Sequence, residues 1–456
     1  MGLCAALKRR GLAVQPFKKG PDYIDPIWLS RASGLVCRNL DLYLMETAEI
    51  RRLYDRLSMG RDACLVEGNK GLYDGLALDG SNSNAELARR LGLPVILVLD
   101  AQGMTRGIAP LILGYQSFDK HIQIAGVVLN KLGGSRHESK LRAVIEHYTD
   151  VPVLGALHQV PGIFVDERHL GLVPGNECDE TESIIQTLGK TIESCVDIAV
   201  LLELTQMRDT TLVSVHEENL PADSPDERVN IGIARDRAFG FYYADDLEAL
   251  ERAGARLVAM DTLRDERLPD IDGLYIGGGF PEQFAVQLSD NHVFRQQLLQ
   301  ALQAGLPAYA ECGGLMYLSR SITWNGVTYP MVGMVPGDVV MHEKPVGRGY
   351  VHLEEQEHHP WPRPNHPSGN IRAHEFHYSV LENLPKDIRF AYAVKRGYGV
   401  DGYNDGIMMN NLLASYTHLR QIGSCSWASR FVAFVRQCKA LSSQVPRVSQ
   451  KSHEYI

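Results

Sequence analysis

Short apolar runs alternate with longer stretches of helical periodicity along the first half of the chain. The helical stretches repeat their apolar positions every three to four residues, whereas the shorter runs are continuously apolar, which is typical of strands buried on both faces of a parallel sheet. This alternation predicts parallel strands joined by crossover helices. We expect strands at 63–67, 94–100, 124–130 and 152–157, and helices at 47–58, 83–91 and 136–147.

A second series of the same kind follows a change in composition. Residues 216–228 are rich in acidic residues and proline and have little to bury, so they predict an interdomain linker. Strand candidates then recur at 229–234, 255–260, 272–279 and 306–311. The fold class is therefore expected to be α/β, with two doubly wound parallel-sheet domains at 1–215 and 229–440 and a flexible polar tail at 441–456.

Composition narrows the class of protein without deciding its function. Apolar residues make up 45% and charged residues 22% of the 456 residues, which is ordinary for a globular protein. A net charge of −9 argues against nucleic acid or an anionic membrane surface as a partner. No apolar run reaches the roughly 20 residues of a membrane span. The eight cysteines lack CxxC spacing, so a reducing cytoplasm fits better than a disulfide framework or a zinc site.

The sharpest local signal is a cysteine between a strand and a helix. In "LPAYAECGGLMYLSRS" a buried strand runs directly into Cys312, and two glycines and a helical pattern follow. This order is typical of a nucleophile elbow, in which a tight turn lifts the reactive side chain out of the sheet. The N-terminus of the following helix favours the thiolate. The alternative, a buried structural cysteine, does not explain the flanking glycines.

A nucleophilic thiol also needs a base and hydrogen-bond donors. His418 ends a strand candidate more than 100 residues downstream, a separation that folding can close. The alternative for His418 is a core histidine satisfied by the backbone. Gly278 and Gly279 lie at another strand end, and together with Gly313 they offer backbone N–H groups for an oxyanion or for the amide of a substrate.

Charged residues gather at two strand ends in the first domain. Lys18 and Lys19 end one strand, and Asp22 and Asp25 follow in a loop bracketed by prolines. Lysines beside paired carboxylates suit a site for a metal and a phosphate group, although a polar surface loop has the same composition.

The next strand candidate ends in a carboxylate. Glu67 ends a buried strand and is followed by a glycine-rich loop that contains Asp74. A carboxylate at this place can reach Mg²⁺, as acidic residues at strand ends do in P-loop enzymes. The alternative is that these side chains cap a helix or turn.

Together these stretches resemble the cobyrinic acid a,c-diamide synthase family, which joins a synthetase domain related to dethiobiotin synthetase to a class I glutamine amidotransferase domain. The resemblance covers most of residues 1–430 and includes "NLDLYL", "GVVLNKLGGSRHESKLRAVIE", "DGLYIGGGFPE" and "ASYTHL". It implies that Cys312 attacks the glutamine amide, with His418 as its base. It also implies that Asp22, Asp25, Glu67 and Asp74 lie in or near the ATP-dependent catalytic centre, with Glu67 and Asp25 as metal ligands and Asn130 near the adenine base.

The resemblance also implies the partners of the reaction. ATP would be a co-substrate with Mg²⁺, glutamine would supply ammonia, and a tetrapyrrole carboxylate would accept it, most directly at the a and c side chains of cobyrinic acid. Siroheme and a nickel-sirohydrochlorin are alternative acceptors. A plain glutaminase and a tetrapyrrole-binding protein that does not bind ATP are alternatives of other classes. The oligomeric state is left open, with a homodimer as one candidate.

The chain departs from the family pattern at two places. Many class I domains carry a glutamate two residues after the histidine, but here that residue is Arg420, so the group that orients His418 is open, with Glu375 as one candidate. The loop GxxxxGK[ST] is absent, and Met1 falls within the helix that follows this loop in the family. We therefore expect the sequence to begin late, with a true loss of ATP binding as the alternative.

Overall fold

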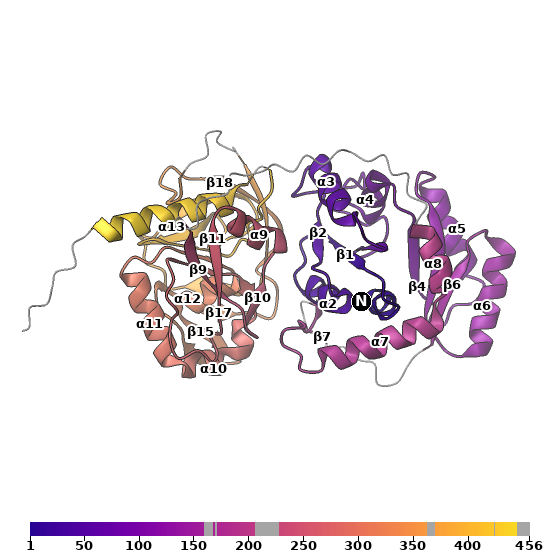
Figure 1. Ribbon diagram of the computed structural model, residues 1–456, viewed down its shortest axis with the longest axis horizontal. Coiled ribbons are helices and arrows are strands. Elements are labelled where there is room, and N and C mark those ends of the chain that lie inside the picture. The colour runs from indigo at the N-terminus through magenta and orange to yellow at the C-terminus, as the bar shows by residue number, and fades with distance from the viewer. Residues whose placement is uncertain (159–166, 169–170, 206–227, 363–369, 424, 445–456) are drawn as a thin grey trace, which may run out of the picture. The chain divides into compact units, whose positions relative to one another are not determined.

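The computed structural model describes residues 1–158, 167–168, 171–205, 228–362, 370–423 and 425–444. The chain divides into two compact units, Met1–Glu218 and Asn219–Ile456. Both units are α/β, which confirms the predicted fold class (Figure 1). The expected linker at 216–228 lies outside the described residues except for Arg228.

The first unit is built on two three-stranded sheets, and both are wholly parallel. One has the order β2 (Arg38–Leu40), β1 (Val14–Lys19), β3 (Ala63–Glu67), and the other has the order β4 (Val95–Asp100), β5 (Ile124–Leu132), β6 (Val153–His158). The helices are α1 (Gly2–Arg9), α2 (Ile24–Ser33), α3 (Thr47–Ser58), α4 (Asn84–Leu91), α5 (Ile108–Phe118), α6 (Ser135–Tyr148), α7 (Thr181–Cys195) and α8 (Ile198–Thr205). A short pair, β7 (Glu167–Arg168) and β8 (Gly171–Leu172), completes the unit.

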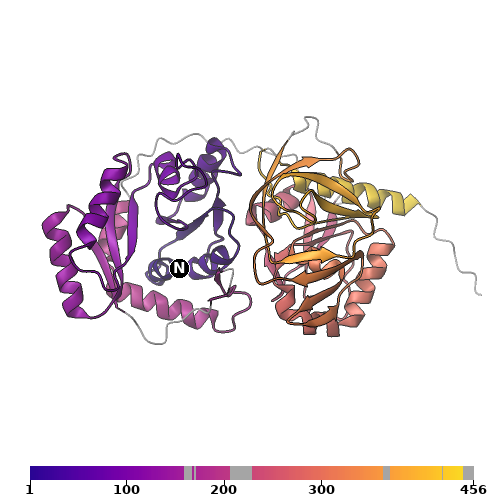
Figure 2. The ribbon, with the colours of Figure 1, turned by 180° about the vertical axis from the view of Figure 1, so that it is seen from behind.

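The apolar faces of the predicted helices pack against these sheets. Helices α5 and α6 cover one face of the sheet β4–β5–β6 (Figures 1 and 2). Ile108 and Ile112 of α5 and Leu141 of α6 are buried in one cluster with apolar residues of β4 and β5. The predicted strand–helix alternation therefore gives the expected crossover packing.

The sheet of this unit is interrupted between β3 and β4. A cavity of about 970 Å³ is lined by both strands and by residues at the start of α1. We expected continuously apolar strands to be buried on both faces, but Val98 of β4 is 63% exposed. The physical reason is that β4 borders this cavity, so its side chains lack a packing partner on that side.

The second unit centres on a nine-stranded sheet. Its order is β11 (Ala255–Met260), β9 (Val229–Ala234), β12 (Gly273–Ile276), β14 (Ala308–Glu311), β23 (Leu412–Ser415), β22 (Asn404–Met409), β21 (Arg389–Arg396), β18 (Gly347–Glu355), β19 (Ile371–His377). The first five strands pair in parallel and the others pair antiparallel. The antiparallel half arises because β21, β22 and β23 follow one another through short connections, which do not allow a parallel crossover.

Smaller elements surround this sheet. A four-stranded sheet has the order β16 (Val327–Pro330), β15 (Ser319–Trp324), β17 (Val335–Met341), β20 (Ser379–Glu382), and β10 (Phe239–Phe241) pairs with β13 (Gly278–Gly279). The helices are α9 (Ala244–Arg252), α10 (Ala285–Asp290), α11 (His292–Gln303), α12 (Gly313–Leu318) and α13 (Trp427–Gln444), with a 3-10 turn, η2 (Pro281–Phe284), before α10. Helix α13 extends four residues into the expected tail, and 445–456 lie outside the described residues.

Alternating residues of the central strands face two different layers. Leu274 of β12 and Ala310 of β14 join the apolar cluster that contains helices α11 and α12. Tyr275 and Tyr309, on the opposite face, pack against Trp427 of α13. Successive side chains of a strand point to opposite faces of the sheet, so the face of each residue on these strands is defined.

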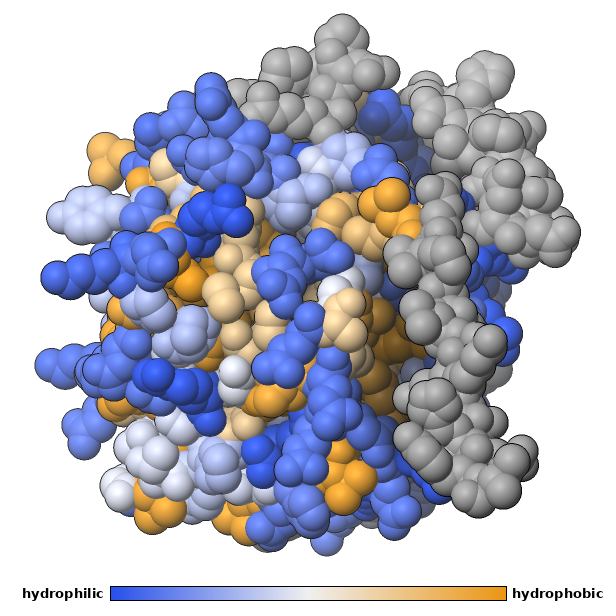
Figure 3. Space-filling view, turned by 90° about the vertical axis from the view of Figure 1, so that its left-hand side faces the viewer, coloured by the Kyte–Doolittle hydropathy of each residue, from blue (hydrophilic) through white to orange (hydrophobic). Residues whose placement is uncertain are grey.

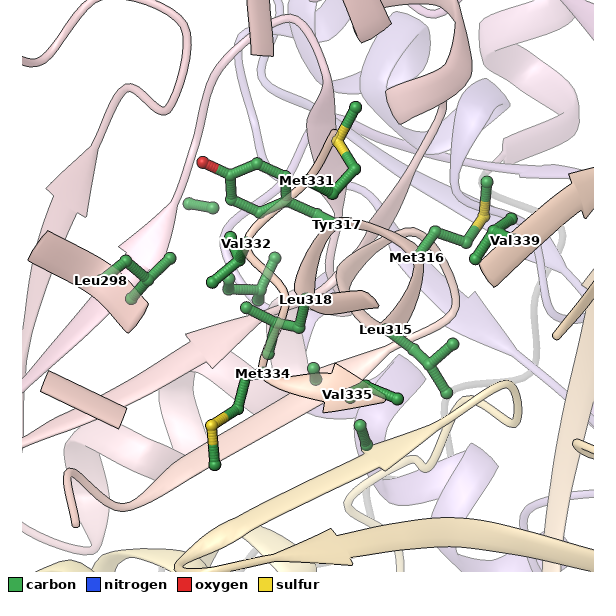
Figure 4. Packing of buried hydrophobic residues seen from close by; sticks show 14 of the residues in the cluster. Leu298, Leu315, Met316, Tyr317, Leu318, Met331, Val332, Met334, Val335 and Val339 are labelled. Atoms are coloured by element: carbon green, nitrogen blue, oxygen red, sulfur yellow. The ribbon is translucent and has the colours of Figure 1, made fainter. Parts of the chain in front are cut away.

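Helix α12 is firmly anchored although it is short. Leu315, Tyr317 and Leu318 are fully buried, and Figure 4 shows them packed among Val332 and Val335. Because α12 begins directly after Cys312, this packing fixes the position of the cysteine.

The surface is mostly hydrophilic on the face that Figure 3 shows, with apolar residues between the polar ones. Within the part of the chain that the structure describes, no helix has the length and apolar character needed to cross a membrane.

Candidate active site

Cys312 stands on a strained turn between β14 and α12. Its backbone has φ 47° and ψ −101°, a conformation that costs an L-residue about 1–3 kcal/mol. The next two residues must be small, because a Cβ on Gly313 would lie 3.0 Å from the backbone of Gly279 and one on Gly314 would lie 2.3 Å from the carbonyl oxygen of Ile276. The turn therefore has the geometry that the strand–Cys–Gly–Gly–helix pattern predicts.

His418 is brought beside Cys312 by the pairing of β14 with β23. The two strands are parallel neighbours, and the N–H of Cys312 donates to the carbonyl oxygen of Ser415 at 2.7 Å. His418 follows β23, is 3% exposed, and exchanges backbone hydrogen bonds with His374 of β19. The two imidazole rings stack with centroids 4.9 Å apart. The fold thus closes the long separation in sequence between the thiol and the imidazole.

The surroundings of His418 favour its protonated form. Burial opposes the charged imidazolium, but hydrogen bonds and charge attraction from Cys312 and Glu311 outweigh it and raise the pKa of His418 to about 10. Cys312 is a hydrogen-bond partner of this imidazole, and the thiolate is the nucleophilic form of a cysteine. The pair is therefore arranged for attack by sulfur.

Three glycines close around this pair. A Cβ on Gly278 would lie 2.7 Å from Cε1 of His418, and one on Gly279 would lie 1.9 Å from the carbonyl oxygen of Ala238. Gly313 approaches Gly279 from the other side. The structure therefore brings together Cys312, His418 and all three glycines singled out in the sequence.

Glu311 is the residue of this site that sequence reasoning missed. Its Oε2 lies 3.5 Å from Nδ1 of His418, and its side chain is 1% exposed. Glu375, the candidate for orienting His418, instead accepts hydrogen bonds from the N–H groups of Tyr398 and Gly399 and lies 3.7 Å from Nε2 of His377. The available signal was a carboxylate directly before the nucleophile in "YAECGG", on a strand that is otherwise apolar or aromatic.

In the first unit, Lys18 gathers three of the predicted carboxylates. Its Nζ lies 2.7 Å from Oε1 of Glu67 and 3.7 Å from Oδ2 of Asp22, and it also forms an ion pair with Asp25. Burial opposes the charge of Lys18, but the three carboxylates hold its pKa well above the ordinary value. Burial and the charge of Asp25 raise the pKa of Asp22, whereas Lys18 overcomes burial to keep the pKa of Asp25 low.

The other predicted residues of this unit form hydrogen bonds or strand pairs with residues other than Lys18. Nζ of Lys19 donates to Oδ1 of Asn82 at 3.0 Å, and burial lowers the pKa of Lys19. Asp74 accepts a hydrogen bond from the N–H of Gly71 within its own loop. Asn130 lies on β5 of the other sheet, opposite Asp100 of β4. Within the described residues, no hydrogen bond or ion pair joins Asp74 or Asn130 to Lys18.

The carboxylates around Lys18 are held by its ammonium group in this arrangement. In the residues that the structure describes, no group of three or more His, Cys, Asp or Glu side chains is placed to hold a metal ion. Glu67 and Asp25, the predicted ligands, share the ammonium group of Lys18 instead. A resident cation at this place would have to displace Lys18 from both carboxylates.

Comparison with known proteins gives one family match within each of the two units. Residues 41–164 match the AAA domain family, and residues 230–422 match the CobB/CobQ-like glutamine amidotransferase domain. A nucleotide-binding domain of the P-loop class joined to a glutamine amidotransferase domain defines a carbon–nitrogen ligase that takes its nitrogen from glutamine.

Relatives along nearly the whole chain make this assignment more specific. The chain is 42% identical over 440 residues to the cobyrinate a,c-diamide synthase of Magnetococcus marinus, covering 96% of this chain and 94% of that protein. It is 39% identical to the enzyme of the same name from Methanosarcina acetivorans, covering 98% of this chain and 94% of that protein. The chain belongs to the cobyrinate a,c-diamide synthase family, which confirms the resemblance seen in the sequence.

Proposed function

We propose that this protein uses ATP and glutamine to amidate side-chain carboxylates of a tetrapyrrole, at the a and c positions of cobyrinic acid. The names of its relatives support this acceptor. The observation that carries the proposal is the strained elbow of Cys312 with His418 held beside it, inside a domain of the glutamine amidotransferase type.

In the proposed glutaminase half-reaction, the Cys312 thiolate attacks the amide carbon of glutamine. The tetrahedral oxyanion is held by backbone N–H groups around Gly313 and Gly279. The carbon–nitrogen bond then breaks, and His418 gives its proton to the departing ammonia. Water hydrolyses the glutamyl thioester with His418 accepting a proton, so that glutamine and water become glutamate and ammonia.

In the proposed synthetase half-reaction, an acceptor carboxylate attacks the γ-phosphate of ATP and forms an acyl phosphate and ADP. Ammonia then displaces phosphate and leaves an amide. Mg²⁺ enters with ATP as part of that substrate. Lys18 and Lys19 are proposed to contact phosphate oxygens, in place of the carboxylates that surround Lys18 and of Asn82 beside Lys19. Asp74 and Asn130 are proposed contacts of the nucleotide.

The test is amide formation with each nitrogen source separately. Purified protein is incubated with ATP, Mg²⁺ and cobyrinic acid, siroheme or nickel-sirohydrochlorin, and products are identified by mass spectrometry. Cys312→Ser is expected to abolish amidation with glutamine and to retain it with ammonia. If wild-type protein amidates none of the acceptors with either nitrogen source, the proposal is wrong. Glutamate release without any need for ATP or acceptor would then indicate a plain glutaminase, and tetrapyrrole binding without turnover would indicate a binding protein.

A further inference from the structure

A buried carboxylate stands directly before the proposed nucleophile and faces the proposed base. Glu311 is the last residue of β14, and its Oε2 lies 3.5 Å from Nδ1 of His418. The two side chains are 1% and 4% exposed. A charge buried this deeply is costly unless its oxygens are hydrogen-bonded, so the other contacts of Glu311 decide what it does there.

Both oxygens of Glu311 are held by fixed donors. Oε1 accepts hydrogen bonds from the hydroxyl of Tyr309 at 2.5 Å and from the N–H of Leu419 at 2.9 Å. Oε2 accepts one from the hydroxyl of Tyr275 at 3.1 Å. Three donors from two strands and from the loop that carries His418 therefore set the orientation of the carboxylate before any substrate binds.

The two tyrosines are suited to remain donors. Their rings are stacked 5.4 Å apart, on the face of the sheet that packs against α13. Burial, and then the charge of Glu311, raise the pKa of each hydroxyl well above its ordinary value. Both hydroxyls therefore stay protonated over the working range of an enzyme, and Oε2 keeps its second lone pair for the imidazole.

Arg420 and His374 also lie near His418, but neither supplies a negative charge to its imidazole. Arg420, which occupies the place of the usual glutamate, pairs with Asp245 at 3.0 Å and lies 4.8 Å from the ring centre of Tyr243. His374 stacks on His418, but burial, His418 and Arg420 hold its pKa well below the ordinary value, so it adds no charge near neutral pH. The groups that raise the pKa of the imidazole are thus Cys312 and Glu311.

We propose that Glu311 is the positioning residue of His418. At 3.5 Å its Oε2 attracts the Nδ1–H of the imidazole, and in the proposed role it keeps the proton on that nitrogen, directs Nε2 to Cys312 and stabilises the imidazolium. The carboxylate is supplied from the residue before the nucleophile instead of from the second residue after the histidine. This inference rests on the proposed roles of Cys312 and His418 in glutamine hydrolysis.

The first test replaces the charge and keeps the shape. Glu311→Gln is expected to lower kcat for glutamate release by about 100-fold or more, with a much smaller change in KM for glutamine, because glutamine binding does not need the imidazolium. The basic limb of the pH profile is expected to move to lower pH, since removing the negative charge lowers the pKa of His418. Glu311→Asp keeps the charge and is expected to restore the position of that limb, though not the full rate.

A matched control removes another buried carboxylate of the same unit. Glu375→Gln loses a carboxylate that faces His377, and glutamate release is expected to stay within a few-fold of wild type. Two results would overturn the proposal. One is an equal loss of glutamate release in Glu311→Gln and Glu375→Gln, and the other is a Glu311→Gln enzyme with the wild-type rate and pH profile. Ammonia-dependent amidation should survive in all these variants and reports that the rest of the enzyme is intact.

A measurement on the wild-type protein covers the case in which Glu311→Gln does not fold. Nitrogen-15 NMR of labelled histidine should show an Nδ1–H of His418 that stays protonated above pH 8. An imidazole of His418 that carries its proton on Nε2 alone would also overturn the proposal. Failure of the proposed function is distinguishable, because it would appear as wild-type protein that amidates no acceptor, or as glutamine hydrolysis that survives Cys312→Ser.

Discussion

Gly314 gives a sharp test of how the elbow is held. A methyl group at this position would lie 2.3 Å from the carbonyl oxygen of Ile276, which belongs to the central strand β12. Heavy atoms at such a contact need at least about 3.0 Å, so Gly314→Ala must move α12 or β12 by several tenths of an ångström. Leu315, Tyr317 and Leu318 move with α12, and all three are fully buried.

The expected magnitude follows from two opposing effects. Alanine favours a helix over glycine by about 1 kcal/mol, whereas overpacking of a core costs about 1–3 kcal/mol. Because the contact is with the backbone of a central strand, the upper part of that range applies and the net loss is about 2 kcal/mol. For a unit of this size the loss corresponds to about 4–8 °C in the midpoint of thermal unfolding. A displaced Cys312 should also lose about 100-fold in the rate of glutamine hydrolysis.

The assays are differential scanning calorimetry and glutamate release. The matched control is Gly114→Ala in α5, where a Cβ would meet no atom within 4 Å, so that only the helix preference acts and the first unit gains stability. If Gly314→Ala unfolds at the wild-type temperature and hydrolyses glutamine at the wild-type rate, the close approach of α12 to β12 does not hold the elbow in place.

Three further predictions concern charged groups. Because the pKa of His418 is raised in the folded state, its protonation stabilises that state fully below pH 6.5, and this contribution is lost as the pH rises toward 10. The thermal midpoint of the second unit should therefore fall over this interval, and it should fall less in His418→Gln. Glu67→Ala should abolish amidation with both glutamine and ammonia, whereas glutamate release persists. Lys18→Met leaves three carboxylates without their cation, so the first unit should unfold at lower temperature, with the loss smaller at pH 5 than at pH 8 because protonation relieves it.

Local patterns predicted the parts of the site that depend on neighbours in sequence. The strand, the cysteine and the two glycines are consecutive, so their order alone fixes the elbow. The family resemblance implied that Asp25 and Glu67 lie in or near one catalytic centre. In the structure both contact Lys18, because β1 and β3 are parallel neighbours whose carboxyl ends meet at one edge of the sheet.

Other features depend on contacts that no local pattern records. The role of Glu311 follows from where the loop after β23 places Nδ1 of His418, and the position of Glu375 in a matching strand gave no indication of the direction of its side chain. Asn130 ends the strand expected at 124–130 in the same way as Glu67 ends its own, but β5 extends to Leu132 and belongs to a separate sheet. Strand order and sheet continuity are decided by packing between elements that are far apart in the chain.

The backbone angle at Cys312 has a consequence for engineering. Glycine adopts φ 47° and ψ −101° without strain, so Cys312→Gly would recover most of the 1–3 kcal/mol stored there, less about 1 kcal/mol for the greater freedom of unfolded glycine. A library screened for heat resistance alone would consequently enrich inactive proteins at this codon. Directed evolution of a more heat-stable enzyme should keep Cys312 constant and measure catalytic activity in every round.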